Sequence, residues 1–168
     1  MRKILVIVFF LLLVTPSYLY AFKYAGIGFG PNIGLKGFDG TNYLLDAVWH
    51  PHDNVGGRLL VGFVNGFWVG AAIDLAHTDE SIFRGVNWTM NFSIPFLVKI
   101  RGNVSDAYIG FTFGNTLLFD LTGEKDYYLS VTPAEFVFIP FTWKMSRGGI
   151  DTGMLVSLFC SVGFRVGL

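Results

Sequence analysis

The chain has 168 residues, of which 52% are hydrophobic, 17% are aromatic and only 14% are charged. A soluble domain of this size carries about a quarter charged residues, so this composition excludes an ordinary water-soluble surface. The 12 basic and 12 acidic residues balance, so we expect no binding to nucleic acid. Beyond the extreme N-terminus, no stretch of the sequence reaches the roughly 18 uninterrupted apolar residues of a membrane-spanning helix. An apolar chain without such a helix indicates a transmembrane β-barrel.

The N-terminus has the pattern of a secretory signal peptide. Arg2 and Lys3 form a charged start, an apolar run follows over residues 4–14, and the small residue Ala21 offers a cleavage site. This order of charge, apolar run and small residue directs export. We therefore predict a cleaved signal peptide over residues 1–21.

The mature chain is predicted to be a single domain over residues 22–168. Loss of the two basic residues of the signal peptide leaves this domain with a net charge of −2. Its only cysteine, Cys160, excludes an internal disulfide or a cysteine-based metal cluster.

Apolar residues alternate with small or polar ones along the whole mature chain. Over residues 86–100 every even position is large and apolar, whereas the odd positions are Asn, Thr, Asn, Ser, Pro, Leu and Lys. The same split recurs over residues 24–36, 107–120 and 153–168. Because successive side chains of a strand point to opposite faces, each segment has one apolar face and one small or polar face.

This two-faced pattern is typical of a barrel in lipid. Small and polar residues fill a narrow lumen while large apolar ones meet the acyl chains, and unpaired backbone groups in hydrocarbon force the sheet to close. A soluble lipocalin-like barrel, the alternative, would carry its charges on the outside. Aromatic residues near the segment ends are predicted to form the interfacial girdles: Tyr43, Trp49, Trp88, Tyr127, Tyr128 and Trp143.

The number of strands depends on two segments, 58–76 and 127–145, that are longer than one strand needs. The first contains Val64-Asn65-Gly66, and the second contains Pro133-Ala134-Glu135. A turn in one of them gives eight strands, and bacterial single-chain barrels have even numbers. We therefore predict eight strands.

The position of the extra turn is left open by the alternation, which a three-residue turn preserves. A turn at Pro133–Glu135 would remove the charge of Glu135 from the lipid face and make residues 77–85 an external loop. A turn at Asn65-Gly66 has the better hairpin dipeptide. We favour the turn at Pro133–Glu135.

Two local motifs resemble those of known outer-membrane barrels. Ser93-Ile94-Pro95-Phe96-Leu97-Val98-Lys99, followed by Ala107-Tyr108-Ile109-Gly110, resembles a hairpin common in these barrels. The C-terminal residues Val162, Phe164, Val166 and Leu168 resemble the strand signal that the barrel-assembly machinery reads, although Leu168 stands where Phe or Trp is usual.

With these motifs the chain resembles the small eight-stranded outer-membrane barrels of the OmpA/OmpX/OmpW kind. The resemblance implies an all-β fold, an eight-stranded antiparallel up-and-down transmembrane β-barrel in the cell outer membrane. It also implies outer-membrane lipid and the barrel-assembly machinery as partners.

Charged residues on the small or polar face are the candidate functional groups of the lumen. One interpretation is a set of internal ion pairs, because a charge inside a narrow barrel needs a partner. The other is a polar path or binding site for a small solute in the space beside the lumen glycines. A wide pore is not expected, since eight strands normally leave a filled interior. The candidates are Lys36, Asp46, His50, Arg58, Asp74, Lys99, Asp120, Lys144, Asp151 and Arg165.

The histidines raise the question of catalysis or metal binding. His50 lies near Asp46, and His77 precedes a Thr-Asp pair, but neither group has a serine at a characteristic spacing for nucleophilic catalysis. The run from His50 through His52 to Asp53 supplies two histidines, which do not complete a metal coordination sphere. We expect no enzyme activity, no metal and no cofactor, with a lipid-modifying activity as a minor alternative.

The function expected from the sequence is a structural role or a narrow, porin-like passage for small solutes. The alternative is a surface adhesin or ligand-binding barrel, in which external loops bind a host ligand. Residues 77–85 are the main candidate for such a loop.

Overall fold

The computed structural model describes residues 23–37, 40–51, 55–101, 104–124, 126–145 and 148–168, with the backbone alone for residues 75–82, 101 and 104. These residues form nine strands. None of the described residues belongs to a helix long and apolar enough to cross a membrane. The strands are β1 (Tyr24–Lys36), β2 (Thr41–His50), β3 (Gly56–Phe63), β4 (Phe67–Phe83), β5 (Val86–Arg101), β6 (Val104–Asp120), β7 (Tyr127–Lys144), β8 (Gly149–Asp151) and β9 (Leu155–Gly167).

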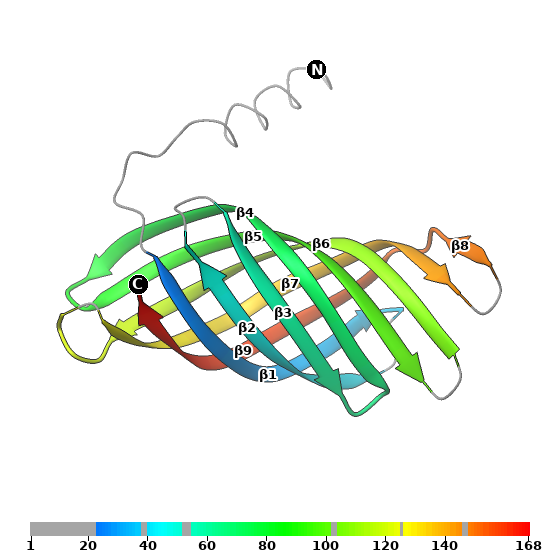
Figure 1. The fold of residues 1–168 in the computed structure, drawn as a ribbon, viewed down its shortest axis with the longest axis horizontal. Coiled ribbons are helices and arrows are strands. Elements are labelled where there is room, and N and C mark those ends of the chain that lie inside the picture. Colours follow the sequence, from blue (N-terminus) through cyan, green and yellow to red (C-terminus); the bar gives the residue numbers. More distant parts are fainter. Residues whose placement is uncertain (1–22, 38–39, 52–54, 102–103, 125, 146–147) are drawn as a thin grey trace, which may run out of the picture.

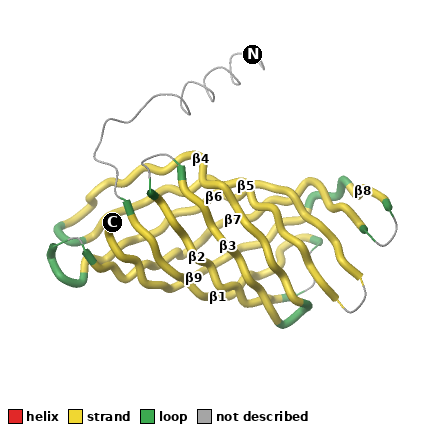
Figure 2. Tube along the Cα trace, in the orientation of Figure 1, coloured by secondary structure: helices red, strands yellow, loops and turns green. Residues whose placement is uncertain are grey.

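Eight of these strands close into a ring (Figures 1 and 2). Neighbours in the sequence pair antiparallel from β1 to β7, β9 pairs with β7, and the first strand pairs with the last to close the barrel. The short β8 pairs with the end of β7 and lies outside the ring. The predicted all-β, eight-stranded antiparallel up-and-down barrel is confirmed.

The two ends of the barrel differ in what they carry. Both termini lie at one end, where Tyr24 pairs with Gly167; we call this the terminal end. The opposite end, where the turn between β3 and β4 lies, is the distal end.

The predicted faces follow from the pleat of each strand. In β5, Thr89, Asn91 and Ser93 point inward and are buried, while Ile94 and Phe96 point outward and are 43% and 49% exposed. Most of the predicted girdle residues are on the outside. Tyr128 is the exception, since it is fully buried inside the barrel. Tyr127 and Tyr128 are consecutive in β7, so they cannot share a face.

The extra turn lies at Val64–Gly66, so the favoured turn at Pro133–Glu135 is wrong. Val64 and Gly66 have φ angles of 109° and 106°. The backbone N–H of Asn65 donates to Oδ1 of Asn42 at 3.1 Å, which fixes the turn against β2. The sequence signal for this hairpin was the Asn-Gly dipeptide.

The prediction of an external loop at residues 77–85 is also wrong. Strand β4 continues to Phe83, because β5 runs beside it along the whole of this length. The connection is a two-residue turn at Arg84–Gly85, where Gly85 has a φ of 80°. Such a φ is open to glycine at little cost.

Strand β7 runs through Pro133–Glu135 with a β-bulge. The pairing of β7 slips by one residue between Thr132 and Glu135. An extra residue in a strand reverses the faces beyond it, so Thr132 points inward before the bulge and Glu135 and Val137 point inward after it. The bulge removes the charge of Glu135 from the apolar outer face, an effect that was expected from a turn.

Candidate functional site: the barrel interior

The interior of the barrel has two halves of different chemistry. The half toward the terminal end is polar and holds most of the buried charges. The distal half holds an apolar cluster of eight buried residues: Leu44, Leu60, Trp68, Leu97, Tyr108, Val137, Ile139 and Phe159.

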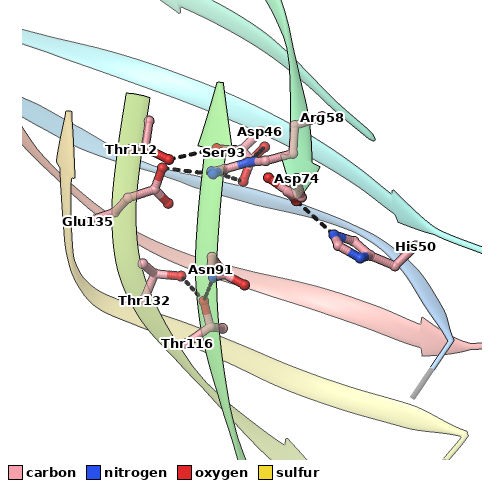
Figure 3. Close-up of polar contacts among 10 residues, drawn as sticks. All are labelled: Asp46, His50, Arg58, Asp74, Asn91, Ser93, Thr112, Thr116, Thr132 and Glu135. Carbon is pink, nitrogen blue, oxygen red and sulfur yellow. Dashed lines mark hydrogen bonds and ion pairs between the residues drawn. The ribbon is translucent and has the colours of Figure 1, made fainter. Parts of the chain in front are cut away.

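Arg58 is the centre of the polar half (Figure 3). Its Nε and Nη2 donate to the two carboxylate oxygens of Asp46 at 3.1 and 2.8 Å. Its Nη1 donates to Oε1 of Glu135 at 2.7 Å. The three side chains are buried, where paired, hydrogen-bonded charges are the form that a low-dielectric interior tolerates.

The contact between Arg58 and Glu135 crosses the lumen. Arg58 lies on β3 and Glu135 on β7, and these strands are separated by three strands in each direction around the ring. They therefore face each other across the barrel. A single arginine joins opposite walls.

A second group of rings and charges lies at the terminal end. His50 Nε2 is 2.7 Å from Oδ2 of Asp74, and the His50 ring stacks on Tyr24 with 4.8 Å between centroids. The guanidinium carbon of Arg165 lies 4.5 Å from the centroid of the Tyr24 ring. Because Tyr24 begins the first strand and Arg165 lies near the end of the last, this group spans the seam that closes the barrel.

Hydroxyl and amide groups fill the space between these charges (Figure 3). Asn91 Nδ2 donates to Thr116 Oγ1 at 2.9 Å, and that oxygen lies 2.8 Å from Oγ1 of Thr132. Ser93 and Thr112 form a further hydroxyl pair at 2.6 Å. These bonds join β5, β6 and β7 on the inside of the barrel.

The structure places the predicted lumen charges in two settings. Asp46, His50, Asp74 and Arg165 are buried inside the barrel, as is Arg58. The others lie at the two rims. Lys99 is half-buried at the distal end, with Nζ 4.8 Å from the Trp68 ring centroid.

The rim residues are outside the enclosed lumen. Lys36 is exposed at the end of β1. Asp120 ends β6, where it accepts hydrogen bonds from the backbone N–H groups of Thr122 and Gly123 at 3.0 and 2.9 Å.

An exposed ion pair lies at the distal rim. Lys144 Nζ is 3.1 Å from Oδ2 of Asp151, with the two side chains 42% and 53% exposed. The backbone N–H of Gly153 donates to Oδ1 of Asp151 at 3.0 Å. This hydrogen bond, together with Lys144, holds the pKa of the Asp151 carboxyl below its ordinary value.

Glu135 is the interior charge that the sequence analysis missed. Alternation had placed it on the lipid face, and only the bulge brings it inward. The available signal was a charged residue two positions after Pro133, in a face that is otherwise apolar. A bulge accounts for such a residue as well as a turn does.

The lumen glycines do not leave an open path. A Cβ on Gly114 would lie 2.7 Å from Cβ of Glu135, and one on Gly62 would lie 2.5 Å from Cδ2 of Leu44. The space beside these glycines is occupied by larger neighbours. Glycine is therefore needed where a bulky side chain of the adjacent strand lies over the backbone.

A small cavity of about 30 Å³ lies in the distal half, lined by Asn32, Trp68, Ser157 and Phe159 among others. This volume suits about two water molecules at roughly 10–15 Å³ each. The gap between Arg58 and Arg165 in the polar half has no volume for a water-sized sphere.

The remaining candidates from the sequence are partly outside the described structure. His52 and Asp53 lie outside the described residues, as does the side chain of His77. Among the side chains that are described, no group of three or more His, Cys, Asp or Glu is arranged to hold a metal ion.

The residues of the predicted assembly signal lie on and just beyond β9. Val162 and Phe164 point outward and are 57% and 42% exposed, Val166 is half-buried, and Leu168 follows the end of the strand. Recognition of this signal by the assembly machinery stays a prediction.

Comparison with known proteins bears on the fold. No family model and no curated protein matches the chain. The crystal structure of Neisserial surface protein A (NspA), an eight-stranded outer-membrane barrel, matches 87% of this chain and 97% of that chain, with a TM-score of 0.54 and 11% identity. The chain has the fold of an outer-membrane barrel. The resemblance predicted from the sequence is confirmed at the level of the fold.

Proposed function

We propose that the protein is an outer-membrane β-barrel with a structural role, held in lipid by its apolar exterior and closed to solutes by its filled lumen. The observation that carries this proposal is the ion pair between Arg58 and Glu135, which joins opposite walls of the barrel. Any solute on the barrel axis would meet these two side chains. The role needs outer-membrane lipid and the barrel-assembly machinery as partners, and it needs no cofactor and no catalysis.

The exterior supports residence in lipid. A continuous apolar surface of this extent is costly in water, and acyl chains would cover it. Export by a signal peptide over residues 1–21, which lie outside the described structure, is part of the proposal. At least one large apolar side chain on each strand of the ring is 49–63% exposed: Ile27, Trp49, Leu59, Ile73, Phe96, Ile109, Phe141 and Val162.

A narrow passage for small solutes is the competing role. It would require the guanidinium of Arg58 to leave Glu135 while both are buried. Separating such a pair leaves an uncompensated charge and costs about 3–5 kcal/mol. The closed state is therefore strongly favoured.

A surface role through external loops has less support. The connections at Val64–Gly66 and Arg84–Gly85 are three and two residues long, and the longest one, between β7 and β9, covers residues 145–154. A specific protein interface usually involves about 20 residues or more on each side. Connections of this length weigh against the adhesin alternative.

Conductance in planar lipid bilayers tests the closed lumen. We expect no stepwise conductance from the wild-type protein. Glu135→Ala removes one end of the contact across the lumen and is expected to give brief openings. Lys36→Ala removes a charge that is exposed at the distal rim, and this matched control is expected to stay silent. Steady channels from the wild-type protein would overturn the proposal.

A further inference from the structure

The wall of the barrel has very different heights on its two sides. Strands β2 and β3 have 10 and 8 residues, whereas β6 and β7 have 17 and 18. Strand β3 is directly opposite β7 in the ring. A short wall and a tall wall therefore face each other, and in Figure 1 the β6–β7 hairpin reaches farther toward the terminal end than β2 and β3 do.

These lengths can be compared with the thickness of a membrane. A strand rises about 3.3 Å per residue and is tilted by roughly 40° in such barrels. Strand β3 then spans roughly 20 Å along the barrel axis, and β7 spans roughly 45 Å. The apolar band of an outer-membrane barrel is about 25 Å tall. The short wall falls below this height and the tall wall exceeds it.

Both walls carry exposed apolar residues on the outside near each end. On the short wall, Tyr43 and Trp49 of β2 are 41% and 59% exposed, and Leu59 of β3 is 63% exposed. On the tall wall, the outward residues run from Tyr127 to Trp143, which are 45% and 55% exposed. The height of the apolar surface therefore follows the length of the strands.

Tilting the barrel does not remove the difference. A tilt shortens the extent of both walls along the membrane normal by the same factor. A lipid bilayer next to a short apolar surface responds by thinning, at a modest cost per ångström of mismatch. The same bilayer does not thin next to an apolar surface that is taller than its hydrocarbon core.

We infer that the lipid bilayer is locally thinner along β2 and β3 than along β6 and β7. This inference rests on the proposed residence in the outer membrane. The short wall is then a surface for short or disordered acyl chains, and the tall wall is one for extended chains. The occupant is lipid on both sides, because the apolar surface is continuous around the ring.

The tryptophans of the chain allow a direct test. Trp49 is outward on the short wall, Trp143 is outward on the tall wall and Trp68 is inside the barrel. One variant keeps Trp49 and carries Trp68→Phe, Trp88→Phe and Trp143→Phe. Its matched control keeps Trp143 and carries Trp49→Phe, Trp68→Phe and Trp88→Phe. Both are refolded into phosphatidylcholine vesicles with dimyristoyl or with longer dierucoyl chains.

Quenching by aqueous acrylamide then reports how close each tryptophan is to water. We expect the Stern–Volmer constant of Trp49 to be unchanged between the two lipids, because the bilayer thins to follow the short wall. We expect that of Trp143 to fall in the longer lipid, because the thicker bilayer covers more of the tall wall. Parallel behaviour of the two tryptophans, whether both fall or both stay constant, would overturn the inference.

A second quencher separates this inference from the proposed function. Lipids brominated on the acyl chains quench tryptophans that contact the bilayer. We expect both single-tryptophan variants to be quenched. If neither is quenched, the barrel does not reside in lipid, and the proposed function fails together with the inference. Quenching by brominated lipid with parallel acrylamide results overturns the inference alone.

Discussion

Arg58 and Glu135, 77 positions apart in the chain, meet across the lumen with 2.7 Å between Nη1 and Oε1. The same guanidinium binds both carboxylate oxygens of Asp46 on the neighbouring strand. One cation thus holds an anion from the neighbouring strand β2 and an anion from β7 across the ring. We regard this contact as the main polar link between the two walls.

Breaking this link is expected to destabilise the barrel. Arg58→Met leaves Asp46 and Glu135 buried without their cation, which should lower the free energy of unfolding by about 3–5 kcal/mol. Adding Glu135→Leu removes one of the two buried charges left without a cation and should recover part of the lost free energy of unfolding. Urea titration of the refolded protein in detergent measures both. Strictly additive effects of the two substitutions would show that the side chains do not interact.

Gly114 lies opposite Glu135, and the absence of a side chain there makes room for the carboxylate. Gly114→Ala would put a Cβ 2.7 Å from Cβ of Glu135. We expect this overpacking to cost about 1–3 kcal/mol of stability. Gly57→Ala on β3 is the control, since its Cβ would meet no atom within 4 Å. Equal unfolding midpoints for the two variants would contradict the position assigned to Glu135.

Val64 is under backbone strain in the turn between β3 and β4. Its φ of 109° is rare for any residue except glycine and especially unfavourable for a β-branched side chain. Val64→Gly is therefore expected to stabilise the barrel by about 1 kcal/mol. Gly66→Ala, at a φ of 106°, is expected to destabilise it. Thermal unfolding of both variants checks the signs, and a destabilised Val64→Gly would show that the turn has another conformation.

The lowered pKa of Asp151 predicts a pH-dependent contribution to stability at the distal rim. This pKa is lowered by the hydrogen bond from the Gly153 N–H and by Lys144. A lowered pKa in the folded state contributes stability above the unfolded pKa of about 3.9, and that contribution is lost as the pH falls through the folded value. A carboxyl NMR titration should show Asp151 titrating below the ordinary aspartate range. Lys144→Met should move the midpoint upward, and an unchanged midpoint would mean that the ion pair does not form in solution.

The alternation of the sequence was sufficient to predict the barrel and most of its faces, and the even strand numbers of bacterial barrels gave the count of eight. It was not sufficient to place Glu135. The pairing of β7 slips once between Thr132 and Glu135 and again between Phe138 and Phe141. The second slip restores the faces that the first one reversed. Residues before and after this stretch therefore keep the same phase, and Glu135 itself is the sign of the reversal in the alternation.

The sequence was also insufficient to predict which buried charges are partners. Asp46, His50, Asp74 and Arg165 were predicted from their positions on the polar face. Which charge meets which depends on the register and closure of the ring, and small slips in register change every contact. The partnership of Arg58 with Glu135 depends on the bulge between Thr132 and Glu135 and on the ring having eight strands.

The central claim is that this chain closes into a barrel whose apolar exterior resides in lipid or detergent. Residues 22–168, refolded into detergent micelles and run unboiled and boiled on an SDS gel, test that claim most directly. We predict a faster-migrating unboiled band and a β-rich circular dichroism spectrum, because a closed barrel with every strand paired resists SDS until it is heated. Identical migration of the two samples, together with rapid cleavage by protease, would contradict the account.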